Sequence, residues 1–382
     1  MKKALLLLTG GRGLPDMLVI KYLHPDITYN ITTKQGLATA ESLKEMAQSE
    51  YNCQMTIQPP VHPNREENIK NACLNVLNMH QDAEWVFCIT SAPKLVSIYA
   101  MDIARERGIP CWFLNTEERE LISLAKNVSV DTEKLFNATV SEYMKAYQRD
   151  FSIPKKQQYR KLAESWYEIA RTLALSPVQT HHFISQFRQA TIGISNQTPV
   201  TLEISTQYTQ FIHNLQKQNV LTINQETSST IQCTIHNPNM REFLKGDWLE
   251  IYVWGEINRT GFTDDNQWGY KIATGQAKNE LDVAFTYRTL LHIIECKTEN
   301  DPFSQKRVEY LDTLDSIANS LGQNYTSKFF ITNHPDPQKV ESFTAFSEQA
   351  AKRKIHVLTG KDLPNLGEFL KKQAENPDFG RH

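Results

Sequence analysis

The sequence lacks the features of a secreted or membrane-embedded protein. Its six cysteines form no CxxC pair and lie mostly in apolar segments, which predicts buried free thiols in a reducing compartment. No window approaches the roughly 18 apolar residues that a membrane span needs. The apolar run Ala4–Leu8 is too short for a signal peptide, because Thr9–Gly13 interrupts it. We therefore expect a first strand, a cytoplasmic location and no membrane partner.

Excess charge and repetition are also absent. A net charge of −2 gives no global attraction to nucleic acid, so contact with a polyanion would depend on local patches. We find no low-complexity tract and no internal repeat with a period of roughly 20 to 50 residues. The 382 residues, 40% of them hydrophobic and 22% charged, indicate a globular chain. Its length corresponds to roughly two or three domains.

Short apolar runs alternate with longer amphipathic segments in the first part of the chain. The runs are Ala4–Leu8, Ile27–Ile31, Cys53–Ile57, Glu84–Thr90 and Pro110–Leu114. The helical patterns include Ala40–Ser49, Glu67–Met79 and Lys94–Arg107, and a further one follows a possible N-cap at Asp131. This alternation is typical of βαβ units around a mostly parallel sheet. It predicts a Rossmann-like α/β domain over residues 1–150.

The remaining sequence divides into a middle segment and a second α/β domain. Residues 151–235 hold two helical patterns, Gln157–Leu173 and Pro177–Gln189, and a stretch suited to a hairpin or wing, Leu221–Ile235. We expect a linker there that resembles a winged helix. Residues 236–382 predict, in order, a helix Asn239–Glu256, a long polar loop, strands Glu280–Thr286 and Leu290–Thr298, a helix Lys306–Leu321, a strand Lys328–Thr332, a helix Gln338–Ala351 and a strand Lys354–Leu358.

Charged residues gather on one face of the two adjacent strands. Side chains two apart share a face of a strand, so Glu295 and Lys297 point one way and Cys296 the other. If the strands form a hairpin around Tyr287–Thr289, Asp282 falls opposite Glu295. Adjacent carboxylates repel unless a cation binds between them, and their oxygens suit Mg²⁺ or Mn²⁺.

Each residue of this cluster has a chemical role in the prediction. Asp282 and Glu295 are expected to hold a metal that polarises a phosphodiester, and Lys297 to orient the attacking water. Glu250 lies among apolar neighbours on the preceding helix, where a buried glutamate needs a partner, and is expected to complete the metal site. His292 is on the opposite face from Glu295 and is interpreted as structural.

The order of these elements resembles the restriction-endonuclease-like family, whose motif is written PD-(D/E)xK. A helix with Glu250, a long loop, a strand with Asp282 and a strand with Glu295 and Lys297 follow one another. Asn279–Val283 stands where the family has Pro-Asp. This departure leaves open whether Glu280 takes part.

Two loops in the first domain suit an anionic ligand. Thr9–Pro15 follows the first strand, and Thr90–Lys94 follows the fourth; both enter a helix, whose N-terminus favours phosphate. In an open α/β sheet, loops after neighbouring strands build the ligand crevice. The spacing of the first loop is not GxGxxG, so it does not specify a dinucleotide. The candidate ligand-binding residues are Thr9, Gly10, Gly11, Arg12, Gly13, Thr90, Ser91 and Lys94.

An N-terminal α/β domain that senses a ligand, fused to a C-terminal PD-(D/E)xK domain, resembles the CARF-domain effector nucleases of type III CRISPR defence. The resemblance covers nearly the whole chain. It implies a homodimer that binds a cyclic oligoadenylate, most often the tetra-adenylate, across its two-fold axis and thereby activates a metal-dependent endonuclease on DNA, RNA or both. Many relatives carry a Gly-Gly loop where this chain has Ser91–Lys94. The ring size of the activator, and whether the sensor cleaves it, therefore stay open.

Two other functions fit parts of the sequence. A non-enzymatic regulator would use residues 151–235 as a winged helix on DNA, with a purely structural acidic cluster. A constitutive repair or junction nuclease would use the first domain only as a scaffold. The acidic cluster argues against the regulator, and the two phosphate-suited loops argue against the constitutive enzyme.

Overall fold

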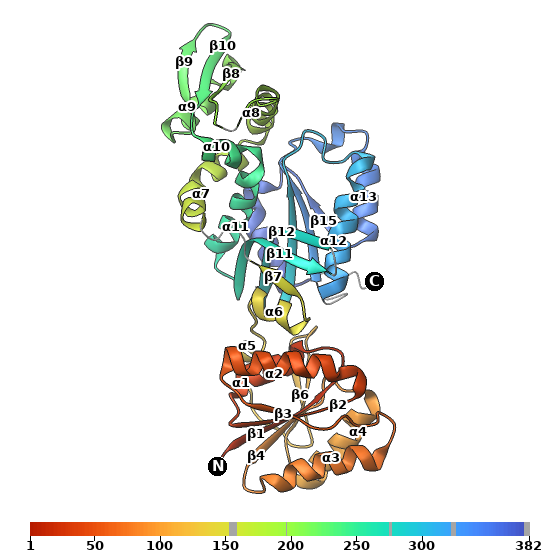
Figure 1. Cartoon of the computed structure of the whole chain (residues 1–382). Helices are drawn as coiled ribbons and strands as arrows, with labels where there is room; N and C mark the ends of the chain where they lie inside the picture. Colours follow the sequence, from red (N-terminus) through yellow and green to blue (C-terminus); the bar gives the residue numbers. More distant parts are fainter. Residues whose placement is uncertain (153–158, 196, 275–276, 322–325, 378–382) are drawn as a thin grey trace. The chain divides into compact units, whose positions relative to one another are not determined.

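The chain divides into two compact units, which are described separately (Figure 1). A computed structural model describes residues 1–152, 159–195, 197–274, 277–321 and 326–377. Unit 1 comprises Met1–Phe151 together with Thr286–Leu290, and unit 2 comprises Ser152–Phe285 and Leu291–His382. No helix among the described residues is long and apolar enough to cross a membrane.

Unit 1 is built on a six-stranded sheet in the order β3-β2-β1-β4-β5-β6. All of its strand pairs are parallel except β5 with β6, which confirms the predicted mostly parallel sheet. The last strand, β6, is not predicted by the sequence, because none of its residues is fully buried and no alternation marks it. The strands are β1 Lys3–Thr9, β2 Ile27–Thr32, β3 Met55–Ile57, β4 Glu84–Cys88, β5 Cys111–Asn115 and β6 Glu120–Leu124.

Helices cover both faces of this sheet, α1 and α2 on one side and α3 and α4 on the other (Figure 1). Helix α6 begins with a capping box between Thr139 and Glu142, and α5 begins at the predicted N-cap Asp131, whose carboxylate accepts the Lys134 N–H. The helices are α1 Leu14–Leu23, α2 Leu37–Tyr51, α3 Glu66–Met79, α4 Lys94–Arg107, α5 Thr132–Leu135 and α6 Val140–Ala146.

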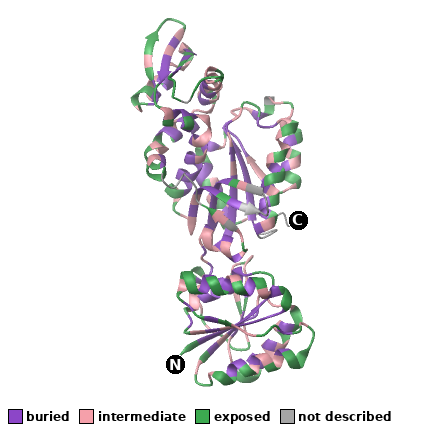
Figure 2. Cartoon of the chain, viewed as in Figure 1, coloured by how far each residue is buried: buried purple, intermediate pink, exposed green. Residues whose placement is uncertain are grey.

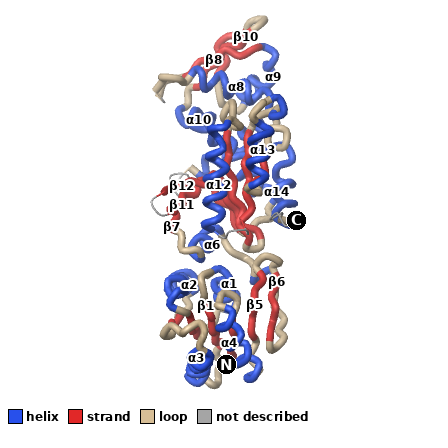
Figure 3. Tube along the Cα trace, turned by 90° about the vertical axis from the view of Figure 1, so that its right-hand side faces the viewer, coloured by secondary structure: helices blue, strands red, loops and turns tan. Residues whose placement is uncertain are grey.

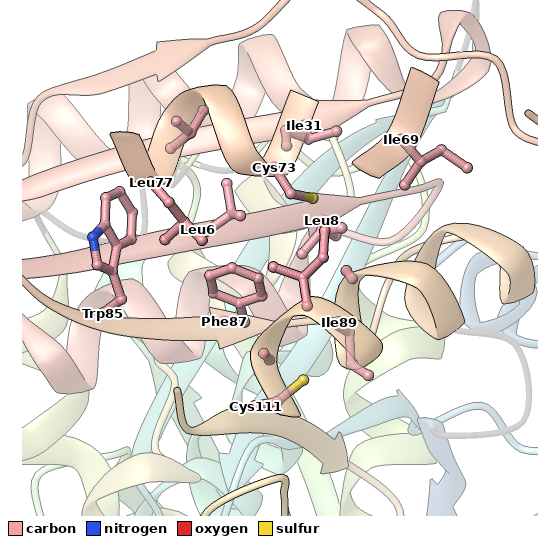
Figure 4. Close-up of a cluster of buried hydrophobic side chains, with 14 of the residues drawn as sticks. Leu6, Leu8, Ile31, Ile69, Cys73, Leu77, Trp85, Phe87, Ile89 and Cys111 are labelled. Atoms are coloured by element: carbon pink, nitrogen blue, oxygen red, sulfur yellow. The ribbon is translucent and has the colours of Figure 1, made fainter. Parts of the chain in front are cut away.

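A cluster of buried apolar side chains forms the core between the sheet and helices α3 and α4 (Figure 4). Leu6, Leu8 and Phe87 from the strands pack against Ile69 and Cys73 from α3. Their burial removes apolar surface from water at about 25 cal/mol per Å², which is the main force holding the helices on the sheet. All six cysteines of the chain are buried and free, as the sequence predicted.

The first part of unit 2 contains helices and a three-stranded antiparallel sheet in the order β8-β10-β9. Hairpin β9–β10 falls within the stretch predicted as a hairpin or wing, whereas β8 was not predicted. Residues 153–158, which include the expected start of the first helix at Gln157, lie outside the described residues. The elements are α7 Arg160–Ala174, α8 Pro177–Ala190, β8 Val200–Ser205, α9 Thr209–Lys217, β9 Thr222–Glu226 and β10 Thr230–Ile235.

The second part of unit 2 contains most of a six-stranded mixed sheet, whose order is β15-β14-β13-β12-β11-β7. The predicted polar loop before β12 is wrong, because much of it forms β11. Asn266, Trp268 and Tyr270 of this strand are all buried. Their alternation is hard to see in the sequence because Asn266 is polar; it is buried because its side chain donates to the Trp254 carbonyl at 2.9 Å. The strands are β7 Asp150–Ser152, β11 Asp265–Thr274, β12 Ala277–Tyr287, β13 Leu290–Lys297, β14 Thr326–Thr332 and β15 Ile355–Leu358.

The helices of this part differ from the prediction at one place. The single expected helix Asn239–Glu256 is instead α10, a π-helical turn and α11, so the turn sets the direction of the helix that carries Glu250. Helices α12 and α13, seen in Figure 3, pack on β14 and β15. Strand β14 is buried throughout, whereas the two middle residues of β15 are only partly buried (Figure 2). The helices are α10 Pro238–Glu242, α11 Trp248–Thr260, α12 Val308–Leu321, α13 Phe343–Lys352 and α14 Leu366–Glu375.

Candidate active site and ligand loops

A two-residue turn sets the register of the β12–β13 hairpin. Arg288 and Thr289 both have positive φ, 45° and 74°, as a type I′ turn requires. This turn places Asp282 opposite Glu295, on one face of the sheet. In the same register Phe285 is opposite His292, and their rings stack with centroids 4.5 Å apart. His292 is fully buried there, away from the carboxylates.

Lys297 joins the two carboxylates. Its ammonium forms an ion pair with Glu295 and lies 3.6 Å from Oδ2 of Asp282. The same Asp282 oxygen accepts a 2.7 Å hydrogen bond from the Cys296 N–H. Lys297 Nζ also lies 4.9 Å from the centroid of the Tyr310 ring, which limits its movement.

Glu250 approaches the cluster from the first turn of α11. Its Oε2 accepts a 2.8 Å hydrogen bond from the Trp268 indole, and its charge contributes to the raised pKa of Asp282 and of Glu295. The structure therefore brings Asp282, Glu295 and Lys297 into direct contact, and Glu250 is near enough for its charge to act on both strand carboxylates. Glu280 is exposed and 3.8 Å from Lys271, so it lies at the edge of the cluster.

The electrostatics of the cluster are those of a buried acidic site. Burial raises the pKa of Asp282 well above its usual range, and the charges of Glu250 and Glu295 raise it further against the opposing effect of Lys297. Burial also raises the pKa of Glu295. Burial alone would lower the pKa of Lys297, but Asp282 and Glu295 outweigh it and raise that pKa.

The donor set fits a hard divalent cation in its chemistry. Carboxylate oxygens are the ligands that Mg²⁺ and Mn²⁺ prefer, and Asp282, Glu295 and Glu250 would supply them. In the described parts of the chain, however, no three or more His, Cys, Asp or Glu side chains are grouped closely enough to hold a metal ion. The Lys297 ammonium lies beside both strand carboxylates instead.

Sequence reasoning missed the residues that hold the cluster in place. Arg188 of α8 donates to the carbonyl and hydroxyl oxygens of Thr298 and, at 3.0 Å, to the Lys245 carbonyl. It thereby links the residue after Lys297 to the turn that precedes the helix of Glu250. Nothing in the sequence pattern distinguishes Arg188 from any other polar residue on an amphipathic helix, because its partners are far along the chain.

In unit 1, the two predicted ligand loops touch. A Cβ atom at Gly10 would lie 2.0 Å from the Ser91 carbonyl oxygen, so only glycine fits there. The loops follow the adjacent strands β1 and β4, on either side of which the sheet extends in opposite directions. This is the topological switch point at which open α/β sheets bind ligands. Gly36 approaches the carbonyl oxygens of Thr9 and Gly10 and was not identified from the sequence.

The candidate residues of these loops fall into two groups. Thr9 donates to Asp16 at 2.7 Å and accepts from Asn30, so its hydroxyl is engaged in the core. Thr90 likewise accepts the Leu114 N–H at 2.8 Å, and Gly13 is buried where a Cβ would lie 2.8 Å from the Ala146 carbonyl oxygen. The exposed candidates are Gly11, Arg12 and Lys94.

Asp16 lies directly beneath the two loops. It is fully buried on α1, accepts from Thr9, and its other oxygen is 3.5 Å from the Cys88 thiol. Burial raises its pKa to about 7, against the opposing effect of hydrogen bonds from Thr9, Cys88 and Ser91. The burial of Asp16 cannot be inferred from the sequence, because an Asp in a first helical turn is ordinarily an exposed, helix-stabilising residue.

A cavity of about 1030 Å³ in unit 1 lies at the N-terminal ends of the central strands β1 and β4. It is lined by Lys3 and Glu84, which begin β1 and β4, and by Arg107. The predicted ligand loops follow the opposite ends of the same strands. The cavity is therefore separate from the crevice that the topology favours.

The fold and these two sites define a class of protein: an α/β chain of two units, with a pair of touching loops at the switch point of the unit 1 sheet and a buried cluster of acids and a lysine in unit 2. Residues 237–376 match the family model of the Card1-like endonuclease domain. This part of the chain is therefore similar to endonuclease domains of that type, and the predicted acid and lysine residues all lie within the matched range.

Solved structures share the fold over the whole chain. Can2 from Sulfobacillus thermosulfidooxidans, in complex with cyclic tetra-adenylate, has a TM-score of 0.72 at 18% identity, covering 97% of each chain. Protein VC1899 from Vibrio cholerae has a TM-score of 0.79 at 15% identity, covering 98% of each chain. A type III CRISPR defence DNA nuclease activated by cyclic oligoadenylate has a TM-score of 0.53 at 13% identity, covering 87% of this chain and 45% of that one. A search of curated proteins found no significant match.

Proposed function

We propose that this chain is a metal-dependent endonuclease of type III CRISPR defence, activated by a cyclic oligoadenylate and hydrolysing phosphodiester bonds in DNA, RNA or both. The observation that carries the proposal is the cluster of Asp282, Glu295 and Lys297 within the Card1-like endonuclease domain. The similar chain Can2 is described with cyclic tetra-adenylate, and another similar chain as a nuclease activated by cyclic oligoadenylate.

The buried cluster supports a hydrolytic mechanism. Asp282 and Glu295, assisted by Glu250, would hold Mg²⁺ or Mn²⁺, which when bound polarises the phosphodiester and lowers the pKa of a water ligand. Lys297 holds its ammonium toward this site, where it can orient the attacking water and stabilise the negative charge that develops on phosphorus-bound oxygens. Tyr310 and the two carboxylates fix the position of that ammonium.

The loop pair in unit 1 supports the activator site. Arg12 and Lys94 are exposed on loops that meet at Gly10 and Ser91, so both can reach phosphates of one ligand. A ring with two-fold symmetry suits an isologous homodimer interface, and stronger binding to one dimer arrangement would shift the population toward the active form. We propose cyclic tetra-adenylate as the activator.

The test is a cleavage assay across a panel of cyclic oligoadenylates. Supercoiled plasmid, single-stranded DNA and RNA are incubated with Mn²⁺ and cyclic tri-, tetra- or hexa-adenylate. We expect cleavage with the tetra-adenylate and loss of cleavage in the double variant Glu295→Ala/Lys297→Ala, which should still bind the activator in calorimetry. Undiminished cleavage by the double variant would refute the site, and full activity without any activator would favour a constitutive nuclease.

A further inference from the structure

A polar pocket lies at the end of β13, the strand that carries Glu295 and Lys297. It has a volume of about 590 Å³ and follows β13 directly, since Glu299 and Asn300 come just after Thr298. Its lining is unusually rich in side chains that can donate hydrogen bonds. The lining residues are Arg188, Glu299, Asn300, Asp301, Ser304 and Arg307.

Arg188 brings a positive charge to this pocket that the nearby Glu299 offsets only in part. Its guanidinium bonds to oxygens of Thr298 and Lys245, all of which are uncharged acceptors. It forms no ion pair with any residue that the structure describes. Burial lowers the pKa of Arg188, and Glu299 partly opposes this effect. A half-buried cation whose nearby acid, Glu299, already pairs with Arg307 is costly, and an anion in the pocket would relieve that cost.

Arg307 connects the pocket to the lysine of the candidate active site. Glu299 lies 2.9 Å from its Nε, and its Nη1 donates to the Tyr310 hydroxyl at 2.9 Å. These contacts fix the plane of the guanidinium and leave Nη2 without a partner among the described residues. Its Cζ lies 5.5 Å from the Tyr310 ring centroid, and Lys297 Nζ lies 4.9 Å from the same centroid. A single aromatic ring thus contacts both cations.

The two acids of the pocket are already engaged. Glu299 pairs with Arg307 and accepts from the Tyr310 hydroxyl at 2.8 Å. Asp301 is exposed and accepts the Phe303 N–H at 3.3 Å. Ser304 precedes the turn Gln305–Arg307 that leads into α12, so backbone N–H groups of a helix start lie beside the arginines.

We propose that this pocket binds a backbone phosphate of the nucleic-acid substrate, next to the phosphodiester that is cleaved. Arginine is the side chain best suited to phosphate, because its planar fork can donate two hydrogen bonds. The inference rests on the proposed function, since a nucleic acid presents a second phosphate beside the one at Lys297. It adds the residues that would hold the strand in place for cleavage.

The test compares two neighbouring cations, only one of which lines the pocket. In the full-length Glu295→Gln protein with cyclic tetra-adenylate and Mn²⁺, binding of a fluorescein-labelled single-stranded DNA is measured by anisotropy at several salt concentrations. We expect Arg307→Ala to raise Kd about tenfold and to reduce the slope of log Kd against log salt by about 0.7. Lys306→Ala, which removes the same charge from the adjacent exposed residue, should change Kd less than about twofold.

A chemically modified substrate localises the effect. A single uncharged methylphosphonate placed beside the cleavage position should weaken binding to the Glu295→Gln protein about tenfold and should cause no further loss with Arg307→Ala. The variant Glu299→Gln/Arg307→Gln keeps the pocket's net charge and guards against loss of folding, and it should show the same insensitivity.

Three outcomes decide the inference. If Arg307→Ala and Lys306→Ala weaken binding equally, or if the methylphosphonate penalty persists in the Arg307 variants, the pocket does not bind phosphate. If either of these results is found and the protein with the native Glu295 still cleaves nucleic acid with an activator, only this inference fails. If that protein cleaves no nucleic acid with any cyclic oligoadenylate, the proposed function fails and takes the inference with it.

Discussion

The two candidate sites are assembled in opposite ways. In unit 1, the ligand loops meet because a side chain is missing: Gly10 allows its loop to touch the Ser91 carbonyl. In unit 2, the site exists because charged side chains are present and buried, with Asp282 and Glu295 on either side of a hairpin and Lys297 beside them. The first arrangement is controlled by shape and the second by charge.

This difference predicts different sensitivities. A site formed by close backbone approach should fail when volume is added, whereas a buried cluster of like charges should fail when charge is removed or its cation is withdrawn. The following experiments test that contrast, beginning with the largest expected effect.

Removal of divalent metal should abolish cleavage and leave activator binding intact. With EDTA, the acidic cluster would lose the cation that polarises the phosphodiester, and activity should return when Mn²⁺ is added in excess. Nuclease assays and calorimetry with cyclic tetra-adenylate measure the two functions separately. Cleavage that persists in EDTA would show that the cluster works without metal.

The substitution Asp282→Asn should lower the cleavage rate about 10³-fold, because a neutral amide is a poor ligand for a hard cation. Cys296→Ala is the matched control. Its thiol is buried and on the opposite face of β13, so the cleavage rate should change less than about threefold. A similar loss of activity in both variants would indicate a general defect of the hairpin.

Adding one methyl group at Gly10 should damage unit 1 far more than adding it at Gly11. The Gly10→Ala methyl would lie 2.0 Å from the Ser91 carbonyl oxygen, whereas the Gly11→Ala methyl meets no atom within 4 Å. We expect Gly10→Ala to cost about 2 kcal/mol of stability and to weaken activator binding. Thermal unfolding and calorimetry of both variants test this, and equal behaviour would contradict the close contact of the loops.

Asp16 should make the stability of unit 1 depend on pH in a defined direction. Its pKa is about 7 in the folded chain against an ordinary value of 3.8, so between these values the folded state keeps a proton that the unfolded state has lost. The free energy of unfolding should therefore fall by about 1 kcal/mol per pH unit from pH 4 to 7 and then level off. Asp16→Asn should flatten this dependence in thermal melts taken across that range, and an unchanged profile would refute the assignment.

The sequence predicts the bounds of a helix well where neighbouring residues mark its two ends. Helix α4 has the predicted bounds, Lys94–Arg107, because Pro93 precedes it and Gly108 closes it in the left-handed conformation. Strand β11 escaped prediction because the buried Asn266 interrupts its apolar alternation. The pattern of charges likewise located Asp282, Glu295 and Lys297, because strand alternation is a local property.

Contacts between distant segments could not be predicted in this way. Arg188 and Thr298 are far apart in the sequence, and only the tertiary fold brings them together. The burial of Asp16 and the engagement of Thr9 also depend on the packing around them. The sequence therefore does not show that the Thr9 hydroxyl belongs to a core hydrogen-bond network.

The turn at Arg288 and Thr289 gives the hairpin a single permitted alignment. Both residues occupy the left-handed region without the freedom of glycine, so the turn has little tolerance for change in length. One inserted residue would move every later side chain of β13 to the other face of the sheet. Glu295 and Lys297 would then face the core and Cys296 the substrate. The turn thus sets which side chains of β13 face the candidate site. A shift of one position there would dismantle the cluster without changing the identity of any of its residues.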